Sequence, residues 1–484
     1  MGSQASQIEQ ESVAAREDVC PLEVREQIRN VILVAVNTGL CYLASPVLYV
    51  SVVHAALCKE LGASDKVCNL PAMAYLIMSA LPLFVAWYFP YVYLLRRILV
   101  VCYGSLAVMT GIVAAALLMP VPVSLQLTLI VVHGGVVGGA RTVAVAIEFE
   151  VLGLAVAPER RGTALGLAYG AGPILAIVGS LVSQLLLTGE LGPLAIAGLD
   201  FPHNFVVLFT ATVPCMALGA YLSSRFVIPL PVREAVRQPF RTGVFGGFGR
   251  FLGQRVVLLA MIIAVLMMAG YQIISNMGLY TKEILGEVPA KYAGFQNTTR
   301  FAFKAVTGLF LGWLLTRTNP KMGLFVTALA GLASVLWAIV VPREWILFGF
   351  ASSPTPAAGE TWIGGAIPLF LLSFGLMGSA ELFGIYITNY ILCCSPRSEM
   401  RRYMAFTMLT LFPAAPAGFL FGGISDHFQG AERALGFRLS FAVAACFIAS
   451  GIVLALFLPA RPRPSESALE LPGAPSADLQ RTTS

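Results

Sequence analysis

Long apolar runs recur along almost the whole chain, and they constrain its fold more than any other feature of the sequence. About twenty apolar residues in a helix are enough to cross the roughly 30 Å hydrocarbon core of a bilayer. About twelve stretches reach that length with few polar interruptions. They cover residues 31–57, 70–89, 98–118, 125–147, 164–187, 205–228, 256–279, 295–315, 322–341, 366–392, 404–424 and 437–458.

The composition agrees with a membrane protein. Apolar residues make up 57% of the chain and charged residues 12%, and the mean hydropathy is +0.81. In lipid only helices or a closed barrel satisfy every backbone polar group. Barrel strands would alternate between apolar and polar residues, whereas these runs are apolar throughout. We therefore predict an all-α polytopic membrane protein with about twelve transmembrane helices.

The positions of Lys and Arg predict how the helices are oriented in the membrane. Most of them fall in connections on the same side as the N-terminus, whereas the opposite connections hold few. Because cytoplasmic loops carry the excess of Lys and Arg, both termini are expected in the cytoplasm. The N-terminal residues lack the pattern of a cleavable signal, which favours a plasma or inner membrane. This topology also explains the net charge of +6, and no basic stripe indicates nucleic-acid binding.

The sequence divides into two halves of six spans each. We expect a cytoplasmic N-terminal tail over 1–29, a six-helix bundle over 30–228, a Pro- and Gly-rich cytoplasmic linker over 229–255, a second six-helix bundle over 256–460 and a disordered cytoplasmic tail over 461–484. The halves echo each other, because Gly-Gly-Ala-Arg at 138–141 corresponds to Gly-Ser-Ala-Glu at 378–381. Parallel repeats of six spans are one construction of secondary transporters, which hold their substrate near the bilayer midplane.

The sequence contains no pattern typical of catalysis, a cofactor or a bound metal. The nine cysteines have neither C-x-x-C nor Cys/His metal spacing. No P-loop occurs, and no cluster of His, Asp or Ser indicates an enzyme that acts on lipids. Cys58 and Cys68 both fall in the first connection on the side away from the termini, so a disulfide between them stays open. We expect a monomer without enzymatic activity or cofactors, whose partners are a small-molecule solute and the lipid bilayer.

The turn Pro-Glu-Arg-Arg-Gly at 158–162 leads into a fifth span that contains Gly166, Gly170 and Gly172. With two sets of six spans and a long basic middle connection, the chain resembles the major facilitator superfamily. The superfamily's Gly-x-x-x-Asp-Arg signature after span two is degraded, because residues 89–97 keep only its basic end.

A second degraded copy follows span eight, where Thr316 stands in place of the acidic residue. A similar Gly-Gly-Ile-Ser-Asp stretch at 422–426 lies at the outer end of span eleven. Because of this position, we do not assign to Asp426 the superfamily's role of holding the two halves together.

Ionisable residues within the spans are few, and each costs about 2.5–3.5 kcal/mol to insert unless it faces water or a partner. Arg141 and Glu148 lie in span four, seven residues apart and therefore on one face of a helix. Arg300 and Lys304 lie in span eight, four residues apart, and repel each other unless an anion sits beside them. Glu381 in span ten is the candidate counterion.

The resemblance implies that spans one, four, seven and ten line a central cavity. These spans supply polar side chains, and Arg300 and Lys304 of span eight complete the set. We predict a substrate site formed by Asn37, Arg141, Gln272, Asn276, Arg300 and Lys304, with Glu148 and Glu381 as proton-coupling residues. The alternative is that Arg141–Glu148 and Lys304–Glu381 are structural ion pairs that hold the helices in register.

These observations favour a secondary active transporter that moves a small organic solute across the membrane by alternating access. Three cations face two carboxylates, which leaves a positive excess for an anionic substrate, and a carboxylate in low dielectric can carry a coupled proton. A drug or metabolite exporter working as an antiporter is the main alternative, although it would favour a more apolar cavity. A transporter-like receptor that binds a solute without flux is the other.

Overall fold

The computed structural model describes residues 22–191, 194–196, 199–229, 246–315, 317–341, 345–347, 350–352, 366–394, 406–409 and 411–460. The first half contains α2 (Val24–Leu43), α3 (Ser45–Leu48), α4 (Val52–Glu60), α5 (Asp65–Cys68), α6 (Leu70–Met78), α7 (Leu81–Tyr88), η1 (Val92–Leu94), α8 (Leu95–Leu118), α9 (Val123–Ala155), α10 (Pro158–Leu165), the π-helical turn η2 (Gly166–Gly170), α11 (Gly172–Thr188) and α12 (His203–Ser223). A short hairpin joins β1 (Glu190–Leu191) to β2 (Leu194–Ala195).

The second half has the same helical character. It contains α13 (Gly247–Gly253), α14 (Arg255–Tyr271), α15 (Ile274–Leu279), α16 (Thr281–Leu285), η4 (Pro289–Tyr292), α17 (Ala293–Leu315), α18 (Pro320–Val340), β3 (Trp345–Leu347), β4 (Phe350–Ser352), α19 (Ala366–Ala380), α20 (Phe383–Cys393), η6 (Phe412–Ala414), α22 (Pro416–His427), η7 (Gly430–Glu432) and α23 (Arg433–Ala455). Strands β3 and β4 pair antiparallel.

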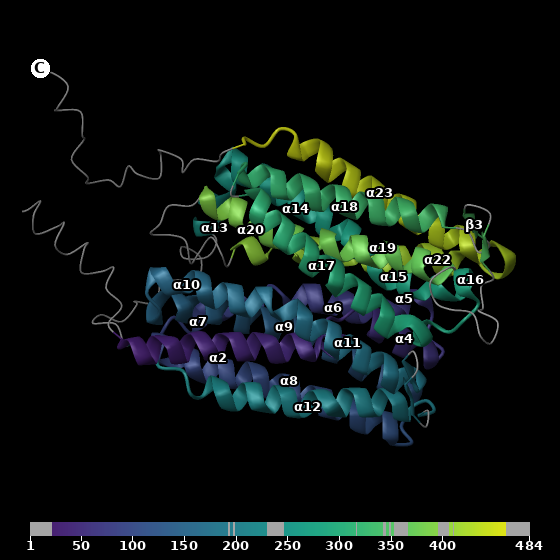
Figure 1. Ribbon diagram of the computed structural model, residues 1–484, viewed down its shortest axis with the longest axis horizontal. Coiled ribbons are helices and arrows are strands. Elements are labelled where there is room, and N and C mark those ends of the chain that lie inside the picture. Colours follow the sequence, from purple (N-terminus) through teal and green to yellow (C-terminus); the bar gives the residue numbers. More distant parts are fainter. Residues whose placement is uncertain are drawn as a thin grey trace, which may run out of the picture.

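The helices of each half pack together, and the two groups lie side by side (Figure 1). Helix α2 begins and α23 ends at one end of the molecule, which we call the terminal end. At the opposite end, the distal end, α4 and α5 of the first half contact α15 and α22 of the second. Helix α11 also packs along α17 across the two halves.

Ten helical segments within the described ranges are long and apolar enough to cross a membrane. The long helices α2 and α17 are not among them, because α2 begins with a charged turn and α17 carries Arg300 and Lys304. The all-helical membrane architecture is confirmed, whereas the count of twelve spans stays a prediction.

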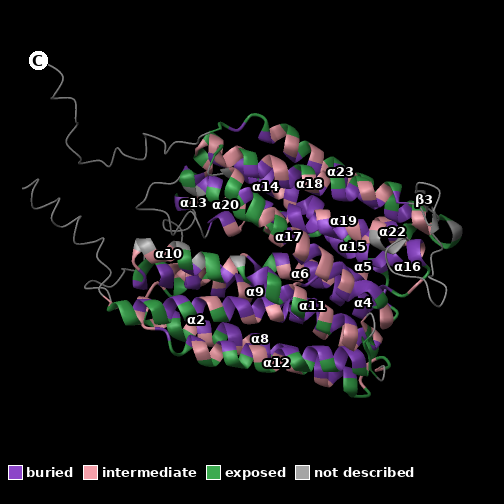
Figure 2. Ribbon diagram, viewed as in Figure 1, coloured by how far each residue is buried: buried purple, intermediate pink, exposed green. Residues whose placement is uncertain are grey.

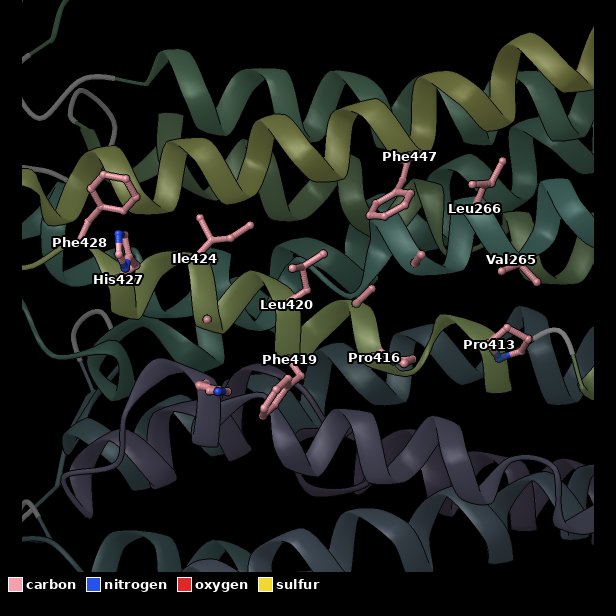
Figure 3. A pocket seen from close by; sticks show the side chains of 14 residues that line it. Val265, Leu266, Pro413, Pro416, Phe419, Leu420, Ile424, His427, Phe428 and Phe447 are labelled. Atoms are coloured by element: carbon pink, nitrogen blue, oxygen red, sulfur yellow. The ribbon is translucent and has the colours of Figure 1, made fainter.

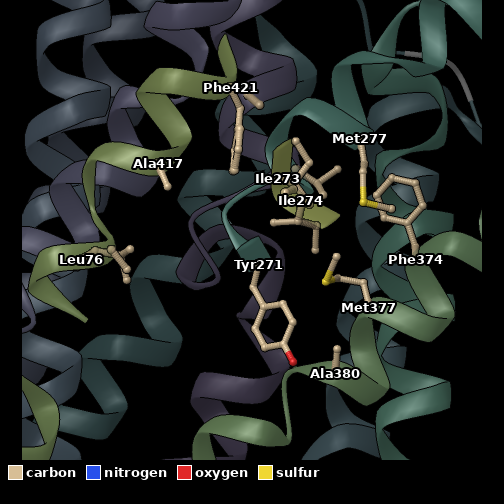
Figure 4. Close-up of a cluster of buried hydrophobic side chains, with 14 of the residues drawn as sticks. Leu76, Tyr271, Ile273, Ile274, Met277, Phe374, Met377, Ala380, Ala417 and Phe421 are labelled. Carbon is tan, nitrogen blue, oxygen red and sulfur yellow. The ribbon is translucent and has the colours of Figure 1, made fainter. Parts of the chain in front are cut away.

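The surface that would face lipid is apolar. Exposed side chains concentrate on the outer faces of the helices and buried ones where the helices meet (Figure 2). Leu309 is 76% exposed and Phe457 73% exposed, fractions that would be unfavourable for such side chains in water. In the second half, Met277 packs near Phe374 and Met377, and this cluster joins α15 to α19 (Figure 4).

Glycines at equivalent places in the two halves allow helices to approach closely. A Cβ atom at Gly138 of α9 would lie 2.1 Å from the carbonyl oxygen of Tyr75 on α6. A Cβ atom at Gly378 of α19 would lie 1.9 Å from the carbonyl oxygen of Arg300 on α17. Both glycines precede an ionisable residue by three positions, so the repeat seen in the sequence corresponds to a repeated packing contact.

Three of the spans predicted to line a cavity are interrupted near their middle. The first breaks between α3 and α4, the seventh between α14 and α15, and the tenth between α19 and α20, which places Glu381 in the break. Helix α9, by contrast, runs unbroken through Arg141. Interrupted helices expose backbone polar groups, and in transporters they occur where a solute or ion is bound.

A polar network at the distal end joins the two halves. The Asp65 carboxylate accepts hydrogen bonds from Lys59 Nζ at 2.6 Å and from Arg433 Nη2 at 3.0 Å. The Asp426 carboxylate accepts the backbone N–H groups of Asp65 and Lys66, both at 2.8 Å, at the N-terminus of α5. We call the contacts of Asp426 with α5 the Asp426 clamp. The sequence placed Asp426 at this end but assigned it no role.

Several boundaries differ from those expected. Helix α2 begins at Val24, within the predicted tail 1–29, and α13 lies within the predicted linker 229–255. Cys58 and Cys68 lie in helices and are free, buried thiols, so no disulfide joins them. The tail over 461–484 and the second copy of the basic turn, at 396–402, fall outside the described residues.

The close contact at Gly378 leads to a test of helix packing. Gly378→Ala should lower the free energy of unfolding by about 1–3 kcal/mol, because the added methyl group meets backbone that must move. Gly312→Ala on α17 is the matched control, since nothing lies within 4 Å of its Cβ position. Thermal unfolding of the purified protein measures both, and equal midpoints for the two variants would contradict this packing.

Candidate functional site

Three charged side chains of the second half form the centre of the candidate site. Arg300 Nε donates to Glu381 Oε1, and Lys304 Nζ donates to Glu381 Oε2 at 3.1 Å. The side chains of Arg300 and Lys304 are 7% and 9% exposed, and that of Glu381 is 15% exposed. The counterion predicted from the sequence is therefore present, and the group carries one excess positive charge.

An aromatic wall from both halves covers these cations. The Arg300 guanidinium lies 5.5 Å from the ring centroid of Tyr49, and the Lys304 ammonium lies 5.3 Å from it. Phe301 packs edge-on against Tyr49 at 5.0 Å, and Tyr42 completes the group. The rings supply a weakly polar face that attracts cations and can also contact the apolar part of an organic solute.

Arg300 also bridges the two halves. Its Nη1 donates to the Ser51 hydroxyl at 3.0 Å and to Asn297 Oδ1 at 3.4 Å. Ser51 lies directly before α4, at the break in the first span. Neither partner of Arg300 was predicted from the sequence, because short neutral polar residues are common in membrane helices. The signal that was available is Ser45-Pro46, which marks the start of the interruption.

Arg141 lies on the other side of the interface, in the first half. It is half-buried, and its Nη1 atom has no hydrogen-bond partner among the described residues. Its charge acts on side chains from four elements, which are Cys41 of α2, Tyr103 of α8, Glu148 of α9 and Tyr169 of η2. A guanidinium inside a helical bundle normally binds an anion or a carboxylate, so Arg141 retains unused binding capacity.

Glu148 does not form the direct ion pair with Arg141 that the structural alternative supposed. The hydroxyl of Tyr103 donates to Glu148 Oε1 at 2.5 Å, and Glu148 Oε2 is buried with no hydrogen-bond partner in the described part of the chain. The physical reason is distance along the helix, since seven residues correspond to a rise of about 10.5 Å. The two charges therefore interact only electrostatically.

The charged groups of the two halves belong to one region. Tyr49 and Tyr75 each lie within electrostatic range of both Arg141 and Glu381. The hydroxyl of Tyr271 is buried, has no hydrogen-bond partner among the residues that the structure describes, lies within electrostatic range of Glu381 and points toward Ala380 (Figure 4). Tyr49 and Tyr75 thus lie within the influence of charged groups from both halves.

The three predicted amide residues have different environments. Gln272 is half-buried at the break after α14, where its Cβ lies 3.7 Å from a Cβ atom built on Gly418 of α22. Asn37 is fully buried and donates to the Ser223 hydroxyl at 3.1 Å. Asn276 is also fully buried, and its Oδ1 accepts from Asn69 of the first half at 2.7 Å.

Asn276 therefore holds helices together and does not face the charged groups. Its Nδ2 contacts the hydroxyls of Ser425 and Ser440, at 3.4 and 3.3 Å, so both ends of the amide are occupied. Asn37 likewise joins α2 to α12. Both amides are buried against neighbouring helices, which favours a packing role, although Asn37 Oδ1 has no hydrogen-bond partner among the described residues. Substrate binding by Asn37 and Asn276 stays a prediction.

Within the described ranges, no group of three or more His, Cys, Asp and Glu side chains is placed to hold a metal ion. The site can instead bind an anion, exchange a proton at a carboxylate and change its contacts across the two halves.

Comparison with known proteins identifies the fold. No protein-family model and no curated protein sequence matches the chain. Among solved structures, a D-xylose–proton symporter is similar, with a TM-score of 0.63 and 13% identity over 90% of this chain and 98% of that one. The nucleoside transporter NupG gives 0.58 and 12% identity over 89% and 98%. A bacterial homologue of the human lysosomal transporter Spinster, in an inward-facing conformation, gives 0.58 and 14% identity over 90% and 98%.

These similarities extend over nearly the whole chain, so the chain has the major facilitator fold that the sequence predicted. At this level of identity they describe the fold and not the solute.

The shared carboxylate leads to a second test. Glu381→Gln should lower the free energy of unfolding by about 3–5 kcal/mol, because it leaves two buried cations without a counter-charge. Lys304→Met should cost about 1 kcal/mol or less, because the remaining Arg300–Glu381 pair is neutral. Thermal unfolding of both variants measures the difference, and a larger loss for Lys304→Met would contradict the assignment of Glu381 as the common counterion.

Proposed function

We propose that this protein is a secondary active transporter that moves a small organic anion across the membrane by alternating access. The observation that carries the proposal is the Arg300–Glu381–Lys304 group, whose carboxylate lies at a helix break, together with the half-buried Arg141 of the other half, whose Nη1 has no hydrogen-bond partner among the described residues. Rocking of two bundles around such a midplane site is how transporters of this architecture work. The neighbours with the same fold are transporters of sugars, nucleosides and other solutes, which supports this class.

In this proposal Arg141 binds the anionic group of the solute. Its guanidinium can form two parallel hydrogen bonds with a carboxylate or phosphate, and its Nη1 is unpartnered. Gln272 and the rings of Tyr42 and Tyr49 contact the rest of the molecule. Arg300 and Lys304 add positive potential, which steers the anion toward the site.

Glu381 responds to protonation in this mechanism. As a carboxylate it holds Arg300 and Lys304, and Arg300 in turn holds Ser51 of the first half. Protonation would weaken both ion pairs. Arg300 and Lys304 could then contact the solute, or change their contacts as one half moves relative to the other. Glu148, with one unpartnered oxygen, is a second position that can take up a proton.

The proposed orientation puts both termini in the cytoplasm, as the distribution of Lys and Arg indicates. The Asp426 clamp and the Asp65 ion pairs then hold the halves together at the outer end. In this arrangement the solute exchanges with the cytoplasm, and transport requires the distal network to open.

The role of Arg141 can be tested in proteoliposomes. A thermal-shift screen of small organic anions at two pH values first identifies the solute, because binding stabilises the folded protein. Arg141→Gln should then lower its counterflow at least about tenfold, the effect of losing a charged hydrogen bond. Lys304→Gln should lower it as well, because it removes the excess positive charge that attracts the anion. Arg97→Gln, an exposed residue at the terminal end, is the control that should transport normally.

Two results would contradict this assignment. Unchanged kinetics in both variants would remove Arg141 and Lys304 from the site. Stabilisation by the solute without counterflow in the unmodified protein would indicate a receptor and not a transporter.

The role of the distal network can be tested by accessibility. Asp65→Asn removes the charge that holds Lys59 and Arg433, so the distal end should open more often. The reporter is Asn69→Cys in a cysteine-free background, because Asn69 contacts Asn276 across the halves. A membrane-impermeant maleimide should label the reporter faster when Asp65→Asn is also present, and equal labelling rates would contradict the proposed closure.

A further inference from the structure

A groove of about 800 Å³ lies on the side of the second half, apart from the candidate site (Figure 3). Its walls come from α14, α22 and α23, and they are apolar over most of their length. Leu266, Leu420, Ile424 and Phe447 point into it in Figure 3. Phe419 and Leu420 are exposed, so the groove is open to the lipid that surrounds the bundle.

The groove has a positive group on one wall. The exposed Lys66 of α5 lines it, and its ammonium lies 4.4 Å from the ring centroid of Phe419. The side chain has no carboxylate partner among the described residues, in contrast to Lys59, which pairs with Asp65. His427, at the C-terminus of α22, lies at the distal end of the groove (Figure 3).

The length of the groove matches one leaflet. The twelve residues of α22 span about 18 Å, and half of the hydrocarbon core is about 15 Å thick. Lys66 and His427 belong to the distal half, and Pro413 and Val265 lie toward the middle of the bundle (Figure 3). An acyl chain in the groove would therefore run from the headgroup level at the distal end toward the bilayer centre.

We propose that this groove binds an anionic phospholipid of the leaflet at the distal end, with an acyl chain along α22. Its phosphate contacts the Lys66 ammonium and the His427 side chain. The charge of Lys66 favours an anionic lipid, because a basic side chain near the membrane surface attracts anionic headgroups by about 1 kcal/mol. Each methylene group buried in the groove adds apolar contact that favours binding.

The site is directly connected to the distal network. Gly423 and Ile424 line the groove, and Asp426, which clamps the start of α5, follows two residues later on the same helix. The side chain of Lys66 enters the groove while its backbone N–H is held by Asp426. A lipid in this position bridges α5 of the first half and α22 of the second, and it stabilises the closed distal end.

The experiment measures lipid binding to the purified full-length protein by native mass spectrometry, with phosphatidylglycerol and phosphatidylcholine as probes. The unmodified protein should prefer phosphatidylglycerol about fivefold, the effect expected for one basic residue at a membrane surface. Lys66→Gln should abolish this preference. Lys282→Gln, another exposed lysine at the distal end that does not line the groove, is the matched control and should keep it.

A second variant tests the apolar part of the groove. Nothing lies within 4 Å of a Cβ atom built on Gly423, so Gly423→Leu can fill the groove without displacing the fold. It should weaken binding of both lipids, and Gly423→Ala should weaken it less. Equal lipid preference in Lys66→Gln and Lys282→Gln, or unmodified binding by Gly423→Leu, would overturn the proposal. These measurements do not depend on transport, so they stand apart from the proposed function.

Discussion

The structure depends on one carboxylate that two buried cations share. Arg300 and Lys304 lie one turn apart on α17, where like charges repel, and both are less than a tenth exposed. Their position is stable only because Glu381 enters from the break between α19 and α20. Gly378 makes this possible, since its missing side chain allows α19 to approach the backbone of Arg300 closely.

This arrangement gives a physical basis for coupling between the halves. A ligand or a proton shifts a conformational equilibrium only if it interacts differently with the two states. Arg300 contacts Glu381 in its own half and Ser51 in the other, so a change in the charge of Glu381 alters a contact between the halves. Arg141 offers the corresponding group in the first half. A solute anion that reached both arginines would favour the conformation in which the two sides are close.

Much of the fold and part of the site could be predicted from the sequence. Apolar runs predicted the helices, and the four-residue spacing of Arg300 and Lys304 required an anion nearby, which is Glu381. The alternative in which Arg141 and Glu148 form a direct ion pair is not seen, because the two residues lie about two turns apart on one helix face. The direction of the Asn276 side chain could not be judged from the sequence, because the break after Tyr271 interrupts the helical periodicity.

The two halves repeat their packing but differ in whether the helix that carries the central charge is continuous. This difference indicates which charged side chain is easier to reorient. Gly138 and Gly378 make equivalent close contacts, each three residues before an ionisable side chain. Helix α9 continues unbroken past Arg141, so the backbone that carries this side chain belongs to a continuous helix. Glu381 follows the last residue of α19 and is not part of a continuous helix, so small backbone rotations there can reorient its carboxylate. In the proposed mechanism, an anion-binding group on a continuous helix opposite an adjustable carboxylate would hold the solute in place while the proton-sensitive contacts around it rearrange.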